Sequence, residues 1–182
     1  MIRRYLLSGA SALLVGTLLH AATLERLSLE DMVVKSTAIV RGRVLASYTA
    51  PYGPVIYTHY KIQVTEHWKG PADPALEVVI PGGVSGGLRQ TFSGAPALGT
   101  GSEYVFFLWT SRSGLTHVMG LSQGLFELKQ DQDGGMVAQR GASAEAMLDA
   151  ATGQPVKDQA VRMRMSDLRQ RVSATLASGA QK

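Results

Sequence analysis

The sequence predicts a mainly β protein, built as a barrel or sandwich with a few peripheral helices. Three observations carry this prediction. Apolar and polar residues alternate from Val55 to Lys69, which is the period of a strand. Short apolar runs recur along the chain and are separated by turns rich in glycine and proline. Helical patterns are confined to short stretches near the two ends of the chain.

The first 22 residues carry the pattern of a secretory signal peptide. Arg3 and Arg4 form a basic tip, an apolar run follows over residues 6–19, and small residues close the segment. The run is short for a membrane span, although an uncleaved N-terminal anchor is the alternative. We therefore expect cleavage after residues 1–22. Residues 23–182 would then form one periplasmic or extracellular β-barrel domain with no membrane span.

Charge and cysteine usage narrow the class of protein. Without the leader the chain has 16 Lys and Arg against 14 Asp and Glu, a net charge of +2. So small an excess argues against a nucleic-acid partner, which needs clustered cationic surface. The sequence has no cysteine, which excludes disulfides, thiolate chemistry, cysteine-ligated zinc and a lipid-modified cysteine. Stability must come from a packed core, which a chain of this length can provide.

The first expected element after the leader is a short helix over residues 27–36. Ser28 can cap it, and Asp31 falls in its first turn. A strand follows over residues 38–48, in which Gly42 predicts a bend or a bulge. Residues 50–54 are expected to form a turn.

The long strand over residues 55–69 has two unlike faces. Ile56, Tyr60, Ile62 and Val64 are expected to point inward, together with the other even-numbered positions up to Trp68. The opposite face is expected to be wet and partly cationic. Its polar members are His59, Lys61, Gln63, Thr65, His67 and Lys69.

Six further strands are expected, at residues 75–80, 88–92, 103–109, 115–120, 124–130 and 136–140. The run 103–109 is nearly all apolar, which is typical of a strand buried on both faces. Residues 131–135, Asp-Gln-Asp-Gly-Gly, are expected to form a hairpin turn. They do not make a calcium loop, because Ala142 stands where that loop needs a glutamate.

The glycine-rich stretch IPGGVSGGLRQ, residues 80–90, could suggest a loop that binds phosphate. Such a loop requires a following helix and, in one class, a lysine after its last glycine. Here a strand-like segment follows and the lysine is missing. We therefore expect these glycines to form a turn.

The last part of the chain changes character. The alanine-rich segment 143–151 predicts a weak helix, and residues 160–165 alternate as a strand. Ser166 can then cap a final helix in which Leu168, Val172 and Leu176 recur every four residues. The domain is thus expected to end in a strand–helix extension over about residues 155–178.

The order of these features resembles that of exported bacterial domains which are similar to the netrin-like and metalloproteinase-inhibitor family. The matching motifs are Ser36–Val44, Trp68–Lys69–Gly70, Pro81–Gly82–Gly83, and Gly101 with Glu103, Tyr104, Phe107 and Leu108. This resemblance covers roughly residues 28–128. It implies a small five-stranded barrel of the oligonucleotide/oligosaccharide-binding (OB) type, with an extra hairpin and peripheral N- and C-terminal helices. Inhibitors of that family chelate the protease zinc with an N-terminal cysteine, so the resemblance carries the fold and not that activity.

The candidate ligand-binding residues are His59, Lys61, Gln63, His67, Arg89, Gln90 and Gln123. The first four lie on the polar face of the long strand, and barrels of the OB type bind ligands on a sheet face. Readers of nucleic acid or sugar interleave aromatic rings there, and Tyr57 is the only one on this face. Gln90 and Gln123 lie between apolar residues. Each amide is expected to hydrogen-bond a strand edge or a bulge, with a pocket role as the alternative.

No catalytic or metal constellation can be assigned. Ser85, Ser93 and Ser122 lie outside a nucleophile motif, and His59 and His67 are roughly 26 Å apart along a strand, too far to share a metal. We therefore expect a non-enzymatic binding or interaction module, without cofactor or metal, for a protein or a cell-envelope component. The alternatives are a periplasmic hydrolase with an unrecognised active site and a metal-binding accessory protein.

Overall fold

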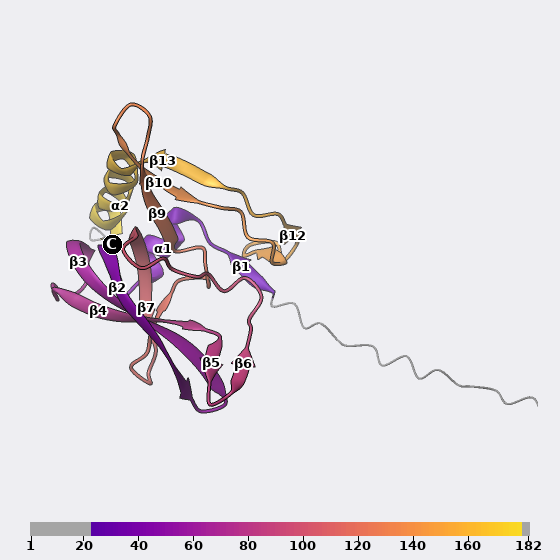
Figure 1. The fold of residues 1–182 in the computed structure, drawn as a ribbon. Coiled ribbons are helices and arrows are strands. Elements are labelled where there is room, and N and C mark those ends of the chain that lie inside the picture. Colours follow the sequence, from indigo (N-terminus) through magenta and orange to yellow (C-terminus); the bar gives the residue numbers. More distant parts are fainter. Residues whose placement is uncertain (1–22, 180–182) are drawn as a thin grey trace, which may run out of the picture.

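A computed structural model describes residues 23–179 of the chain (Figure 1). The expected signal peptide, residues 1–22, lies outside the described residues. The described part is mainly β, as predicted, and has two α-helices. Its largest unit is an eight-stranded mixed sheet with the strand order β13-β10-β9-β7-β2-β3-β4-β8.

The elements follow one another with short connections. The first half of the chain contains β1 (Leu24–Arg26), α1 (Leu29–Lys35), β2 (Ala38–Tyr52), β3 (Val55–Lys69), β4 (Ala75–Pro81), β5 (Gly83–Ser85) and β6 (Leu88–Gln90). The second half contains β7 (Glu103–Thr110), β8 (Thr116–Val118), β9 (Leu125–Gln130), β10 (Met136–Arg140), β11 (Met147–Asp149), β12 (Pro155–Val156), β13 (Val161–Arg164) and α2 (Met165–Gly179). The predicted strands of the middle of the chain are confirmed, with their ends moved by a few residues.

The sheet differs from the five-stranded barrel that was expected. One edge of β7 pairs with β2, and the other edge is divided between β9, at residues 104–106, and β8, at residues 108–110. Because β9 occupies part of that edge, the sheet continues through β10 to β13. β8 in turn joins β4 by a single parallel bridge between Val79 and His117.

Two hydrophobic cores lie on opposite faces of β7, so the prediction that this strand is buried on both faces is confirmed. Tyr104, Phe106 and Leu108 belong to the first core, which β2, β3 and β4 complete. Val105 and Phe107 belong to the second core, which α1 and α2 cover. Figure 1 shows α2 beside β10 and β13, whereas β1 and β12, which form a three-stranded sheet with β11, lie at the right of the view.

Specific hydrogen bonds cap both ends of helix α1. Ser28 Oγ accepts from the Asp31 N–H, and the Asp31 carboxylate accepts from the Ser28 N–H, which forms the capping box that the sequence predicts. Lys69 Nζ donates to the carbonyls of Val33 and Val34 at the other end of α1, so Lys69 is half-buried rather than solvated. The final helix begins at Met165, one residue before the predicted cap.

The long hairpin of β2 and β3 confirms the alternation in the sequence, with two corrections. The strands pair as far as Tyr52 and Val55, so the turn shrinks from residues 50–54 to Gly53 and Pro54. The ladder also shifts register at Gly42, as predicted, and at two further places, between Ile39 and Val40 and between Val44 and Ala46. Such bulges turn the following side chains to the opposite face.

The glycine-rich stretch forms the β5–β6 hairpin, which confirms the turn. Gly86 and Gly87 connect the strands with φ values of +56° and +79°, a conformation that glycine adopts without steric cost. The helix predicted for residues 143–151 is wrong, because Met147–Asp149 forms a strand between β1 and β12. Met147 is fully buried there, and this packing overrides the weak helical preference of its alanine neighbours.

Candidate functional site

The polar face of β3 is exposed at Lys61, Gln63 and His67, as expected. His67 Nε2 donates to the carbonyl of Asp73, 2.7 Å away, and so fixes the connection to β4. The expectation that His59 is solvated is wrong, because only 8% of its surface is exposed. Glu66 departs from the expected inward face and joins a polar cluster described below, whereas Trp68 packs against the second core and donates to Glu66 through Nε1.

The three other candidates lie apart from that face. Arg89 is exposed on the β5–β6 hairpin. Gln90 accepts from the Ile56 N–H and donates to the Pro54 carbonyl, so it braces the turn of the β2–β3 hairpin. Gln123 is fully buried, accepts from the Leu27 N–H and donates to the Glu25 carbonyl. Both side-chain amides therefore hydrogen-bond backbone groups, which is the interpretation that the sequence favoured over a pocket role.

Cross-strand register brings five residues into one row. Successive Cα partners run from β2 through β3, β4 and β8 to β7. Partners in a ladder point to the same side of a sheet, so these side chains share the face opposite the first core. At the usual spacing between strands, the row extends about 19 Å. We call it the aromatic row; it consists of Tyr48, His59, Val79, His117 and Trp109.

The rings of the row form two stacked pairs on either side of Val79. Tyr48 lies on His59 with ring centroids 4.6 Å apart. Trp109 lies on His117 with centroids 4.7 Å apart, and Tyr57 meets His117 edge-on at 5.9 Å. The outer members remain accessible, since Tyr48 is 46% exposed and Trp109 is 39% exposed. The surface therefore offers aromatic faces to a ligand at both ends.

A carboxylate stands beside the first pair. Glu77 accepts from Tyr48 Oη at 2.9 Å and from His59 Nδ1 at 2.7 Å. Burial acts to raise the pKa of Glu77, but these hydrogen bonds outweigh it and the pKa lies below the ordinary value. The group is thus a carboxylate at neutral pH, which can only accept, so His59 Nδ1 is the donor of this hydrogen bond. Lys61 is the Cα partner of Glu77 on the neighbouring strand and adds a cation.

A small hollow of about 170 Å³ lies at the Trp109 end of the row. Tyr57, His117 and Leu121 are among the residues that line it. Leu121 has φ of +65°, the only positive value at a non-glycine residue between residues 23 and 179. Backbone strain of this kind clusters at functional sites. Burial lowers the pKa of His117, so its ring is neutral at neutral pH.

Sequence reasoning found only the β3 part of this site, because no single strand contains all of it. Tyr48 is far from Trp109 and His117 in the chain. The three join one row only through the pairing of β2 with β3, β3 with β4, β4 with β8, and β8 with β7. The available sequence signal for the rest of the row was Trp109, a large aromatic residue at the end of the nearly all-apolar run 103–109.

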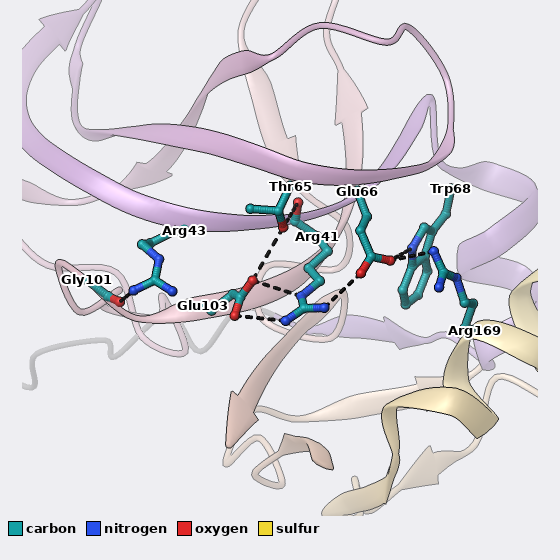
Figure 2. Close-up of polar contacts among 8 residues, drawn as sticks. All are labelled: Arg41, Arg43, Thr65, Glu66, Trp68, Gly101, Glu103 and Arg169. Atoms are coloured by element: carbon teal, nitrogen blue, oxygen red, sulfur yellow. Dashed lines mark hydrogen bonds and ion pairs between the residues drawn. The ribbon is translucent and has the colours of Figure 1, made fainter. Parts of the chain in front are cut away.

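A second polar cluster fixes α2 to the sheet (Figure 2). Arg41 donates to Glu103 through Nε at 2.8 Å and to Glu66 through Nη1 at 2.8 Å. The second oxygen of Glu66 accepts from Trp68 Nε1 and from Arg169 of the helix. An adjoining cleft of about 630 Å³ carries charges of both signs. Because the members of the cluster satisfy one another, we assign them to the attachment of α2.

Between residues 23 and 179, no three His, Asp or Glu side chains are placed to hold a metal ion together. In the same part of the chain, neither helix is long and apolar enough to cross a membrane. No known family model matches the chain, and a search of curated proteins finds no relative.

Proposed function

We propose that this protein is an exported, non-enzymatic binding module that holds a glycan of the cell envelope on the aromatic row. The leader-like pattern of residues 1–22 supports export to the periplasm or beyond. The row supports binding, because it places accessible rings and a carboxylate on one face of a rigid sheet.

The chemistry of the row favours a sugar chain. Aromatic faces stack on flat, weakly polar ligand surfaces, and sugar rings present such surfaces on the faces that bear their C–H groups. Glu77 and Lys61 beside the rings supply an acceptor and donors for hydroxyl groups. The two stacked pairs, on either side of Val79, would contact separate sugar units of one chain.

The pairing of the strands supports the finer assignment to a barrel of the OB type, in line with the netrin-like resemblance. β2, β3, β4, β8 and β7 pair in that order, and β7 pairs again with β2. The face of the second and third strands of an OB barrel is its usual ligand surface. Here those strands are β3 and β4, which carry His59, Tyr57 and Glu77.

The proposal is tested by titrating the purified protein with a tetramer of N-acetylglucosamine and with solubilised envelope glycan, using calorimetry. We expect saturable binding without release of shorter sugars. Stacking of a nucleobase on an aromatic side chain is worth about 1–3 kcal/mol, and we expect the same range for a sugar ring. Trp109→Ala and Tyr48→Ala should then each weaken binding by about 5- to 150-fold.

Phe92→Ala is the matched control, since Phe92 is as exposed as Trp109, at 39%, but lies outside the row. Binding that is unchanged in both row variants would reject the aromatic row as the site. Failure to bind either glycan would reject the ligand class, and turnover of the tetramer would favour the hydrolase instead.

A further inference from the structure

A larger cleft of about 820 Å³ lies elsewhere on the molecule and shares no lining residue with the hollow of the aromatic row. Its volume falls in the usual range for small-molecule sites, about 300–1,000 Å³. Two segments that follow β6 and β10 form most of its wall, and their side chains are small, including Ala95, Ala97, Ala142 and Ala144. Glu145 and Ser93 also line it.

Glu145 is a buried carboxylate without a cationic partner. Only 9% of its surface is exposed. Ser93 Oγ donates to its Oε1 at 2.5 Å. Within the described residues, no nitrogen of Lys, Arg or His lies within 4.0 Å of its oxygens. Burial of a carboxylate removes its hydration, and without a cationic partner this raises the free energy of the folded state. The burial of Glu145 therefore requires an explanation.

The two arginines that line the cleft are engaged elsewhere. Arg140 forms a bidentate ion pair with Asp158, through Nη1 and Nη2. Arg162 pairs with Asp131 at 3.1 Å and donates to Gln139. Neither guanidinium therefore neutralises Glu145 in this structure.

The fold holds Glu145 in place by specific contacts. Its own N–H donates to Ser143 Oγ, and the Ser143 N–H donates to Asp158. Its side chain packs on the α-carbon of Gly94, where an added Cβ would stand 2.5 Å from Glu145 Cγ. Gly94 also has φ of +74°. The position of the carboxylate thus depends on the absence of a side chain at residue 94.

We propose that this cleft binds a ligand that carries a primary ammonium group on an aliphatic stem. Glu145 accepts the ammonium, Ser93 orients the carboxylate, and the alanine-lined walls contact the stem. A bound cation would compensate the buried negative charge, which no Lys, Arg or His nitrogen within 4.0 Å does in residues 23–179. The lysine side chain is the simplest ligand group with this chemistry.

The test is an NMR titration of the purified protein with Nα-acetyl-lysine amide, with Nα,Nε-diacetyl-lysine amide as the neutral analogue. We expect saturable shifts of the amide signals of Ser93, Gly94 and Glu145 with the first compound only. Since hydrogen bonds to charged groups are strong when desolvated, Glu145→Gln should weaken binding by about 10- to 100-fold.

Glu30→Gln is the control, because Glu30 forms an exposed ion pair with Arg171 on the helices and should not affect binding. If Glu145→Gln does not fold, the comparison of the two compounds on the unmodified protein decides the question. Equal binding of the neutral analogue, or shifts that avoid the cleft, would overturn the proposal.

Discussion

Tyr48 lies almost parallel to His59, with an angle of 15° between the ring planes. The phenol ring is close to half exposed, and it covers an imidazole that stands on the outer face of a sheet and is nevertheless buried. Tyr48 covers one face of the His59 ring and therefore contributes to its burial. Tyr48 thus acts on this site in two ways that can be tested separately. Its ring covers the imidazole, and its hydroxyl group donates to Glu77.

Removal of the ring should expose His59. In Tyr48→Ala, we expect the rate of modification of His59 by diethyl pyrocarbonate, followed by mass spectrometry, to rise several-fold. Tyr48→Phe keeps the ring and loses only the hydrogen bond to Glu77, so the rate should stay close to that of the unmodified protein. An equal rise in both variants would mean that the hydrogen bond, and not the stacked ring, protects the imidazole.

The bulge at Gly42 should tolerate no side chain. A Cβ there would lie 2.5 Å from Ile62 Cγ2 and 2.8 Å from the Gln63 carbonyl oxygen. Overpacking of a well-packed site costs about 1–3 kcal/mol, so Gly42→Ala should lower the free energy of unfolding by that amount in urea denaturation. Gly141→Ala is the control, because no atom lies within 4 Å of the added Cβ and φ is not positive. That change should be neutral or slightly stabilising.

The sequence predicts this hairpin well because its information is local. Alternation over residues 55–69 identifies a strand, and a glycine within an apolar run identifies a bulge. The aromatic row is different. The shift between Val44 and Ala46 turns Tyr48 to the outer face, and its neighbours His117 and Trp109 depend on which strands pair. Neither fact can be read from residue spacing.

The wrong prediction of a helix over residues 143–151 has a related cause. The strand at Met147–Asp149 exists because β1 and β12 lie on either side of it. Its partner β1 is three residues long and has no alternation from which to predict it. Gln123 holds that region to the sheet through two backbone hydrogen bonds, which the sequence predicted only as an unspecified amide contact.

Loss of the Gln123 amide should release the segment before α1. In Gln123→Leu, the Leu27 N–H and the Glu25 carbonyl lose their partners. Each of these partly buried hydrogen bonds contributes about 0.5–1.5 kcal/mol to the folded state. We expect faster hydrogen exchange of the Leu27 amide, with the amides of β7 unchanged. Gln90→Leu, which removes a similar amide from the β2–β3 turn, should leave Leu27 unaffected.

The ion pair of Arg140 and Asp158 should make stability depend on pH. Both side chains are buried, and that of Asp158 is 2% exposed. Burial acts to raise the pKa of Asp158, but hydrogen bonds from Arg140 and the Ser143 N–H outweigh it, so the pKa lies below its ordinary value of 3.8. A lowered pKa in the folded state stabilises the protein above pH 3.8, and this contribution is lost as the pH falls through the native pKa.

Asp158→Asn should therefore destabilise the protein by about 3–5 kcal/mol at neutral pH, because it leaves Arg140 buried without its counter-charge. Urea denaturation between pH 7 and pH 2 should show the difference from the unmodified protein shrinking below pH 3.8, where Asp158 itself becomes protonated. Asp133→Asn is the matched control, since Asp133 is 65% exposed and its nearest cation, Arg164, is 3.9 Å away. Exposed pairs contribute about 0–1 kcal/mol, so a large effect of Asp133→Asn, or a constant effect of Asp158→Asn across this range, would contradict the assignment.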